Sequence, residues 1–283
     1  MMTLSVAIPD TALADCSGLR EKTLKVGTIA RALAVFRVDT VYVYTSGRLN
    51  HSDRRDPILL TRLLQYMDTP QYLRKRVFAH SPSLRYAGML PPLRTRSHPL
   101  NEDNTLEVGE VRWGIQVRKG RIDIGLNELI RYPHTVSERT PSLFRVEEVS
   151  PLRLSTLERE DVERYWGFVV ETLSDLVGHL QGSFGVTRIA MSRNAPLFSH
   201  LEDDLKSTVS GTGNVLVVFG GPHAGVSEIL EKDRSALKDN IDFWINVIAG
   251  QGTSTVRLEE AIFAGLALLN NSVGSLMSRP GFY

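Results

Sequence analysis

The sequence predicts an α/β domain that is interrupted by a small, separate β-barrel. Two observations carry this prediction. Strand-like and helix-like segments alternate at both ends of the chain, whereas residues 77–150 hold short β-rich pieces separated by glycine and proline. Alternating strands and helices are typical of a parallel sheet that helices cover on both faces. Because the β-rich stretch stands between two α/β segments, we expect an insertion rather than a tandem domain.

The first 70 residues predict two strands and two helices. In order, the expected elements are a strand at Leu4–Ile8, a helix capped by Ser17 that runs to about Phe36, a strand at Val41–Tyr44 and a helix at Ile58–Met67. Asp56 is a suitable cap for the last helix, and Pro57 suits its first turn, where an amide hydrogen has no partner anyway. Thr69-Pro70 is expected to end it.

The middle of the chain predicts short antiparallel strands. Val108–Val117 and Arg121–Leu126 are split by Lys119-Gly120, as in a hairpin, and Leu143–Val149 predicts a further strand. Several short strands with glycine-marked turns are typical of a small barrel, here of about 75 residues. We therefore place the barrel at residues 76–154 and the interrupted α/β domain at residues 1–75 and 155–283.

The last 130 or so residues return to alternating helices and strands. The expected elements are a long amphipathic helix from Thr156 to His179 that includes Trp166 and Phe168, strands at Thr187–Met191, Val215–Phe219 and Trp244–Ile248, and a closing helix from about Val256 to Asn270. Ligands of open α/β sheets collect where such strands end. We therefore expect the functional site in the loops that follow these three strands.

Composition narrows the class of protein. The 283 residues are 42% hydrophobic and 23% charged, as in an ordinary soluble globular protein. A single cysteine, Cys16, excludes an intrachain disulfide and a cysteine-based zinc site, and no His, Asp and Glu cluster has metal-ligand spacing, so we expect no metal. No apolar run reaches the roughly 18 residues of a membrane helix. The chain lacks a secretory signal pattern, which predicts a cytoplasmic protein without a membrane partner.

The formal net charge of +1 conceals a basic middle and an acidic end. Residues 71–100 hold six cationic side chains and no acid, with tyrosine and phenylalanine among them, a mixture that suits phosphate contact and base stacking. The candidate RNA contacts are Arg74, Lys75, Arg76, Arg85, Arg94 and Arg96, with Arg118 from the predicted barrel. The alternative is a solvated loop that is basic without binding RNA.

Two common nucleotide-binding motifs fail in the loops at the strand ends. Gly220 and Gly225 have the glycine spacing of a phosphate-binding loop, but Val226 stands where that motif needs lysine. Gly250-Gln251-Gly252 begins a dinucleotide fingerprint, but Thr255 occupies the third glycine position. For each loop alone, turn glycines and a helix cap by Thr253 or Ser254 remain the alternative.

Together the loops resemble the knot loops of the SPOUT class of S-adenosylmethionine-dependent RNA methyltransferases. The similarity is closest to the archaeal and eukaryotic family with a β-barrel insert, which includes uridine N3-methyltransferases of large-subunit rRNA. It rests on Ile8-Pro9 and the run Leu19–Ala32 at one end, and on Phe219-Gly220-Gly221-Pro222, Asn246–Thr253 and Thr255–Ala261 at the other. The resemblance covers nearly the whole chain. It implies a knotted SPOUT-type parallel sheet covered by helices, an inserted OB-like barrel that binds RNA, and a homodimer.

The resemblance also implies roles for particular residues. S-adenosylmethionine would be bound by Arg193, Phe219, Gly220, Gly221, Asn246, Ile248, Gly250, Gln251, Gly252, Thr253 and Thr255. Arg257 is the candidate catalytic residue, because it could stabilise the uridinate that forms when N3 loses its proton. The alternative is a surface arginine paired with Glu260. Glu228 and His223 are possible proton acceptors, but a surface-helix role and a loop role are the respective alternatives.

We therefore predict an S-adenosylmethionine-dependent RNA methyltransferase that acts on rRNA, with uridine N3 as the expected target. The alternative is a non-catalytic RNA-binding or ribosome-assembly protein of the same fold. A nucleotide-dependent enzyme of another class is disfavoured by the two failed motifs.

Overall fold

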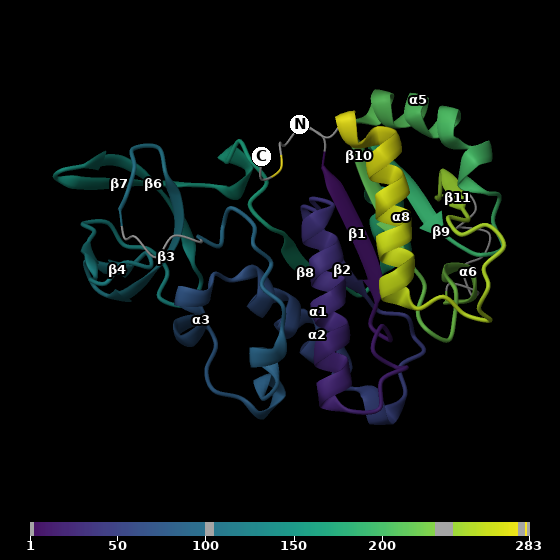
Figure 1. Cartoon of the computed structure of the whole chain (residues 1–283), viewed down its shortest axis with the longest axis horizontal. Coiled ribbons are helices and arrows are strands. Elements are labelled where there is room, and N and C mark those ends of the chain that lie inside the picture. The colour runs from purple at the N-terminus through teal and green to yellow at the C-terminus, as the bar shows by residue number, and fades with distance from the viewer. Residues whose placement is uncertain (1–2, 100–104, 230–239, 277–280, 282–283) are drawn as a thin grey trace.

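Two sheets lie at opposite ends of the molecule, as Figure 1 shows. The structure is a computed structural model that describes residues 3–99, 105–229, 240–276 and 281. The larger sheet is parallel and is built from both ends of the chain, and the smaller one is antiparallel and is built from its middle. The predicted combination of a parallel α/β sheet with a separate β-rich segment is therefore confirmed.

The parallel sheet has six strands in the order β11-β9-β10-β1-β2-β8. They are β1 (Leu4–Pro9), β2 (Thr40–Tyr44), β8 (Val169–Leu173), β9 (Val186–Met191), β10 (Asn214–Val218) and β11 (Phe243–Ile245). Every neighbouring pair is parallel. Their carboxyl ends consequently share one edge of the sheet, and β9, β10 and β11 are close neighbours along that edge.

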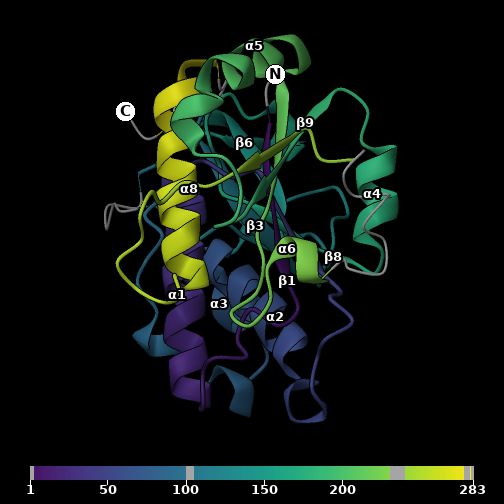
Figure 2. The ribbon, with the colours of Figure 1, turned by 90° about the vertical axis from the view of Figure 1, so that its right-hand side faces the viewer.

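Helices cover both faces of this sheet. They are α1 (Leu19–Val35), α2 (Asp56–Asp68), α4 (Leu176–Gly182), α5 (Glu202–Thr212), α6 (Val226–Ile229) and α8 (Leu258–Val273), whereas α3 (Gln71–Val77) lies towards the antiparallel sheet (Figure 1). Figure 2 shows α1 and α8 on one face and α4 and α6 on the other. Successive strand residues alternate accordingly: Val6 and Ile8 join the core under α1 and α8, and Ala7 joins the core under α4 and α6.

The long helix predicted from Thr156 to His179 is wrong. This stretch forms the end of β7 (Leu152–Leu157), the 3₁₀-helix η4 (Arg159–Asp161), β8 and the start of α4. Gly167 has φ +91°, which a right-handed helix does not allow, and the Phe168 amide donates to Asp68 Oδ1 at 2.9 Å. Beyond this turn, Val169 and Val170 pair with β2, so the chain becomes the edge strand of the parallel sheet.

The antiparallel sheet is curled and has the order β5-β4-β3-β6-β7. Its strands are β3 (Val111–Arg118), β4 (Arg121–Asp123), β5 (Ile130–Arg131), β6 (Ser142–Val149) and β7. The predicted hairpin at Lys119-Gly120 is confirmed, because Gly120 adopts φ +75° between β3 and β4. The ladders of the described residues include none between β5 and β7, the pair that would close this sheet into a barrel.

Several predicted boundaries move by a few residues. Gly18 is the N-cap of α1 in place of Ser17, whose amide and hydroxyl instead donate to Glu21. Strand β11 ends at Ile245 rather than Ile248, because the Asn246 side chain accepts the Ile248 amide in a turn. Within the described residues, no helix is both long and apolar enough to cross a membrane, and no three His, Cys, Asp or Glu side chains gather in a group that could hold a metal.

Candidate functional site

The loops that follow β9, β10 and β11 lie near α6 and the start of α8 (Figure 1). They enclose a cleft of about 240 Å³. The three strands are neighbours in a parallel sheet, so their loops leave the same edge side by side. The loops supply most of the lining, and the first turns of α6 and α8 complete it. The sequence prediction that these loops form one site therefore agrees with the geometry.

Hydrogen bonds join the β9 and β11 loops across the floor of the cleft. The Ser192 amide donates to the Ile245 carbonyl at 3.0 Å, and the Asn246 amide donates to the Pro196 carbonyl at 2.8 Å. The Asn246 side chain adds a link, because its Nδ2 donates to the Arg193 carbonyl at 2.9 Å. Asn246 thus orders both loops as well as lining the cleft.

The β10 loop is tight because two glycines allow backbone to approach backbone. The Gly221 amide donates to the Ala224 carbonyl at 2.8 Å and closes the turn. A Cβ added to Gly220 would lie 2.8 Å from the Gly225 Cα and 2.9 Å from the Val226 nitrogen, so the loop has no room for a side chain there. The buried Tyr44 hydroxyl anchors the loop by donating to the Phe219 carbonyl at 2.8 Å.

The β11 loop is held by its own polar side chains. Gln251 Nε2 donates to the Thr253 carbonyl at 2.8 Å, and Thr253 Oγ1 donates to the Thr255 carbonyl at 2.8 Å. Arg193 Nη1, from the β9 loop, donates to the Ser254 carbonyl at 3.3 Å. Gly250 adopts φ +56°, a left-handed conformation that suits glycine.

The cleft is lined by apolar side chains, by glycine backbone and by a few polar or charged side chains. Met191 and Leu258 supply apolar surface, and Arg193, His223 and Glu228 supply polar side chains. Glu228 is the only acid among the described lining residues, and its Oε2 accepts the Gly225 amide at 3.1 Å. His223 Nε2 lies 3.4 Å from the Ala14 carbonyl, as expected of a loop residue. Such a cleft can hold an aromatic ring against its apolar wall and charged groups at its rim.

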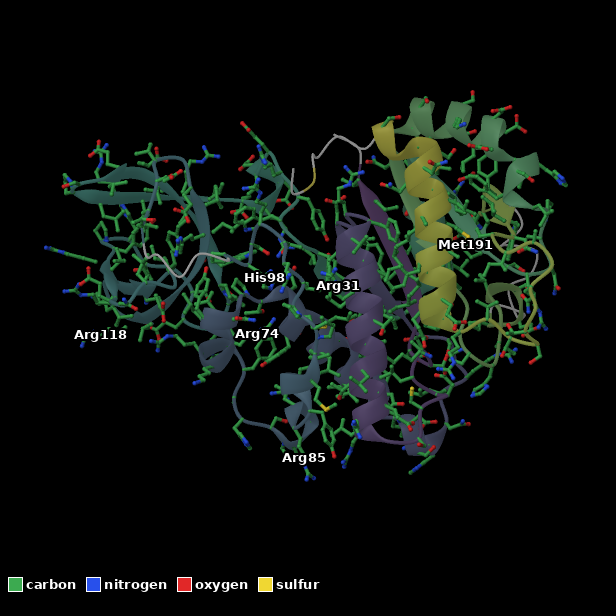
Figure 3. The ribbon with its side chains drawn as sticks, viewed as in Figure 1. Arg31, Arg74, Arg85, His98, Arg118 and Met191 are labelled. Carbon is green, nitrogen blue, oxygen red and sulfur yellow. The ribbon has the colours of Figure 1, made fainter. Side chains whose placement is uncertain are left out.

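Most of the predicted cofactor residues line the cleft. They are Arg193, Phe219, Gly220, Gly221, Asn246, Ile248, Gln251 and Thr255, whereas Gly250, Gly252 and Thr253 belong to the β11 loop but do not line it. Sequence reasoning missed Met191, Val256 and Leu258. Met191 is the last residue of β9 and lies under α8 (Figure 3), and the other two flank Arg257. Their positions at a strand end and a helix start were the signal that could have found them.

Arg257 stands at the mouth of the site rather than in it. It is the exposed N-cap residue of α8 and is not among the lining residues, although its neighbours Val256 and Leu258 are. Its amide donates to Glu260 Oε2 at 2.9 Å, so the alternative pairing with Glu260 is present through the backbone.

The seven predicted RNA contacts do not form one patch. Figure 3 shows Arg118 at the antiparallel end of the molecule and Arg85 near α1 and α2. Arg76 forms an ion pair with Asp123. Lys75, Arg85, Arg94 and Arg96 are exposed.

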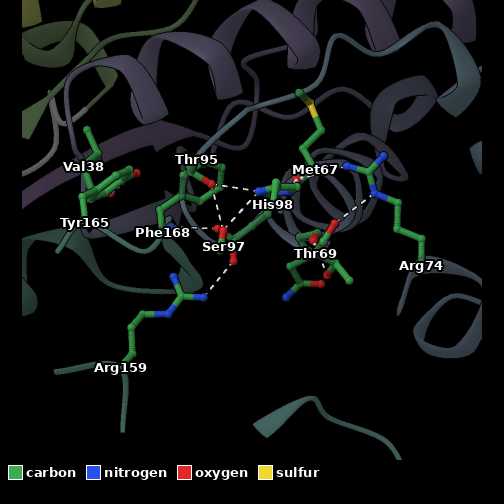
Figure 4. Close-up of polar contacts among 12 residues, drawn as sticks. Val38, Met67, Thr69, Arg74, Thr95, Ser97, His98, Arg159, Tyr165 and Phe168 are labelled. Carbon is green, nitrogen blue, oxygen red and sulfur yellow. Dashed lines mark hydrogen bonds and ion pairs between the residues drawn. The ribbon is translucent and has the colours of Figure 1, made fainter. Parts of the chain in front are cut away.

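Arg74 departs most from the prediction, because its side chain points inwards (Figures 3 and 4). Its Nε donates to the Thr69 carbonyl at 2.9 Å and an Nη to the Met67 carbonyl at 3.3 Å. These carbonyls end α2 and have no partner within the helix, so a cation there is favourable. Burial lowers the pKa of Arg74 below its usual value. Arg74 therefore stabilises the end of α2.

A buried polar junction beside the antiparallel sheet was also missed (Figure 4). His98 is buried, with Nδ1 at 2.8 Å from Thr95 Oγ1 and Nε2 at 3.0 Å from the Met67 carbonyl. Asp68 accepts from Arg159 Nη2 at 2.8 Å and from the Phe168 amide. Burial lowers the pKa of His98, which keeps the imidazole neutral. These contacts tie α2 to the segments that lead into and out of the antiparallel sheet.

Comparisons with known proteins agree with this geometry. Residues 3–269 match the model of a family described as "Putative RNA methyltransferase". An uncharacterised protein of Haloarcula marismortui is 30% identical over 286 residues, covering 95% of this chain and 99% of the relative. Two proteins named 28S rRNA (uridine-N(3))-methyltransferase are also similar. The mouse protein is 26% identical over 98% of this chain and 78% of the relative, and the human protein is 28% identical over 94% and 77%.

Proposed function

The chain belongs to the family described as "Putative RNA methyltransferase", and on that basis we propose that it transfers the methyl group of S-adenosylmethionine to a base of rRNA, with uridine N3 as the target. The observation that carries the proposal is the cleft where the β9, β10 and β11 loops meet. The names of the mouse and human relatives support the target atom.

The cleft has the features that S-adenosylmethionine needs. Its apolar wall, which includes Phe219, Ile248 and Leu258, offers a surface for the adenine ring. Gly220 and Gly221 let the β10 loop fold tightly, because the loop's own backbone fills the Cβ position of Gly220 and the Thr11 side chain that of Gly221. This tight turn shapes one wall of the cleft. Arg193 can pair with the carboxylate of the methionine part, and Glu228 with its ammonium group. We propose that Asn246, Gly250, Gln251, Gly252, Thr253 and Thr255 bind directly or shape the β11 loop.

The bound cofactor supplies an electrophilic methyl group on a sulfonium centre. Methylation of uridine N3 forms an N–C bond, breaks the S–C bond and releases the N3 proton, and the sulfur leaves as a neutral thioether. Because N3 is protonated at neutral pH, the proton must leave and negative charge develops on the base. Under this proposal Arg257, the exposed N-cap residue of α8, would stabilise that charge.

The remaining parts of the proposal follow from the same resemblance. We propose that the C-terminal part of the parallel sheet forms the SPOUT-type trefoil knot and that two copies of the chain complete the site as a homodimer. The curled antiparallel sheet would be the OB-like RNA-binding insert, and the protein would act in the cytoplasm.

Titration calorimetry followed by methyl transfer to rRNA tests this function. The wild type should bind S-adenosylmethionine and methylate rRNA, and mass spectrometry of nucleosides should find 3-methyluridine. Arg257→Ala should bind the cofactor as tightly as the wild type does. Its kcat should be roughly 10²–10³-fold lower, the usual effect of removing a group that stabilises charge in the transition state. Glu260→Gln is the control for changes at the start of α8, because Glu260 accepts the Arg257 amide. Glu259 is less suitable as a control, because it pairs with Lys25.

Two outcomes would contradict the proposal. No cofactor binding at millimolar concentration would remove the methyl donor. RNA binding without methyl transfer would favour the non-catalytic RNA-binding alternative.

A further inference from the structure

A second cavity, of about 490 Å³, opens beside α3 and is distinct from the cleft. It lies between the end of α2, the last turns of α3 and the segment 78–85 that follows them. Its walls include Tyr66, Phe78 and Leu84, and its cationic and polar lining includes Lys75, His80 and Arg85. We call these six residues and the space between them the α3 pocket.

The wall of the α3 pocket is aromatic and is held in place by its surroundings. Tyr66 and Phe78 meet edge to face, with ring centroids 5.2 Å apart and planes at 62°. The Arg74 guanidinium carbon lies 4.6 Å from the Tyr66 ring centroid. Hydrogen bonds to the end of α2 fix Arg74, which lies over the Tyr66 ring. The guanidinium group and the two inclined rings therefore form a fixed aromatic wall. An aromatic ring that is held in place in this way can stack with a nucleobase without selecting the sequence of the RNA.

The charges around the α3 pocket suit a polyanion. None of the described residues that line it is acidic, although the chain as a whole has nearly as many acids as bases. Lys75 and Arg85 are exposed at the rim, and Arg85 stacks 5.5 Å over the Tyr86 ring. An uncharged lipid or an apolar peptide would leave these cations without partners. A nucleotide offers both a ring for the pocket and a phosphate for the rim.

The α3 pocket is far from the candidate methyl-transfer cleft. The cleft lies at β9, β10 and β11, whereas α2 packs against β8 at the other end of the sheet order and α3 follows α2 towards the antiparallel sheet. Three strand intervals separate β10 from β8, which is about 14 Å at about 4.8 Å each. Figure 3 likewise shows Arg74 and Arg85 well away from Met191. A base in the α3 pocket is therefore not the base that lies in the cleft of the same chain.

We propose that the α3 pocket binds one unstacked nucleotide of the RNA substrate, with its base against Phe78 and Tyr66 and its phosphate at Lys75 and Arg85. This inference rests on the proposed function, because it assumes that RNA is the substrate. It assigns the pocket to anchoring the strand while a different nucleotide is methylated.

Binding of a fluorescent single-stranded rRNA fragment to the full-length protein, measured by anisotropy over a range of salt concentrations, tests the proposal. Phe78→Ala should weaken binding about tenfold while leaving the salt dependence unchanged, because it removes stacking and no charge. Lys75→Ala should lower the slope of log K against log salt by about 0.7, the value for one phosphate contact on a single strand. Phe184→Ala and Lys206→Ala are matched controls, since Phe184 is 90% exposed on the α4–β9 connection and Lys206 lies on α5.

A photo-crosslink from 5-bromouridine in the same fragment locates the contact. We expect crosslinked peptides from residues 66–85. Wild-type affinity in both variants, loss of affinity in Lys75→Ala alone, or a crosslink that maps elsewhere would each overturn the nucleotide pocket. Thermal melts show whether Phe78→Ala is folded, and Lys75→Ala changes only an exposed side chain.

Cofactor titration of the same variants separates this inference from the proposed function. Unchanged S-adenosylmethionine affinity with lost RNA affinity supports the α3 pocket. Absence of cofactor binding in the wild type would contradict the methyltransferase proposal. The α3 pocket would then be judged by RNA affinity and crosslinking alone.

Discussion

Replacing Gly220 by alanine should damage the candidate cofactor site more than any other single methyl group added to its β10 loop. The added Cβ would lie 2.8 Å from the Gly225 Cα and 2.9 Å from both the Ala224 carbonyl oxygen and the Val226 nitrogen. All three are backbone atoms of the same turn, so no flexible side chain can move aside. The turn that the Gly221–Ala224 hydrogen bond closes must open instead.

The expected cost follows from this crowding. Overpacking of one methyl group in a close-packed site costs about 1–3 kcal/mol. At about 2–4 °C of Tm per kcal/mol for a protein of this size, Tm should fall by roughly 2–12 °C. An opened turn would also misplace the backbone groups proposed to contact S-adenosylmethionine. Loss of two hydrogen bonds, each worth about 1 kcal/mol, would weaken binding by roughly thirtyfold.

Gly225→Ala is the matched control, because a Cβ there meets nothing within 4 Å. Differential scanning fluorimetry and titration calorimetry on the wild type and both variants give Tm and cofactor affinity. We expect Gly225→Ala to match the wild type in Tm; it is a control for stability and not for affinity, because Gly225 also lines the cleft. The reasoning is refuted if Gly220→Ala keeps wild-type Tm and affinity, or if the two alanines lower Tm equally.

Three further predictions use other parts of the structure. Lys25 is buried and contacts the partly exposed Asp15 at 2.6 Å and Glu259 at 3.2 Å. Lys25→Met should therefore lower the free energy of unfolding by about 1–3 kcal/mol in urea titrations, whereas Arg20→Met, at an exposed position, should change it by less than about 0.5 kcal/mol. Burial lowers the pKa of His98, so the unfolded chain binds a proton at this residue more readily, and the free energy of unfolding should fall as pH drops below about 6.5. Thermal melts from pH 7.5 to 5 should show a smaller decrease in Tm for His98→Gln than for the wild type. His200→Gln, at an exposed position, should show the same decrease as the wild type. Asn246→Ala removes one hydrogen bond from the β11 loop to the β9 loop and one within the β11 loop. It should weaken S-adenosylmethionine binding about tenfold or more in calorimetry, with Asn194→Ala as the control; equal affinities would contradict the structural role of Asn246.

Local sequence patterns are sufficient to predict the strands that consist of a short apolar run between turn residues. The strands that became β1, β2, β9 and β10 were predicted within about two residues, because short apolar runs between turn residues have few other stable arrangements. The cleft was predictable for a related reason. Parallel strands bring their carboxyl ends to one edge, so the glycine-rich loops after β9, β10 and β11 had to meet.

Features that depend on distant contacts could not be predicted from the sequence. The segment before α4 has helical spacing of apolar residues, yet Gly167 turns against Asp68, which lies about 100 residues earlier in the chain. Arg74 has the composition of an RNA contact, but its side chain turns inwards to the end of α2. In both places the deciding partner is a backbone or carboxylate group that no local pattern reveals.

The strand order relates the insertion to the proposed RNA path. The chain leaves the parallel sheet after α2, builds the antiparallel sheet and returns as β8, the edge strand beside β2. Both connections to the antiparallel sheet therefore lie at one edge, and the cleft lies towards the other.

The α3 pocket lies on the side of the insertion, about 14 Å or more from β10 by strand spacing. A free nucleotide can occupy only one of the two sites, whereas an RNA strand that reaches both gains affinity from the second contact at a high effective concentration. This arrangement favours a structured or extended RNA over a nucleoside as substrate, because only a polymer can use the α3 pocket to hold a base at the cleft.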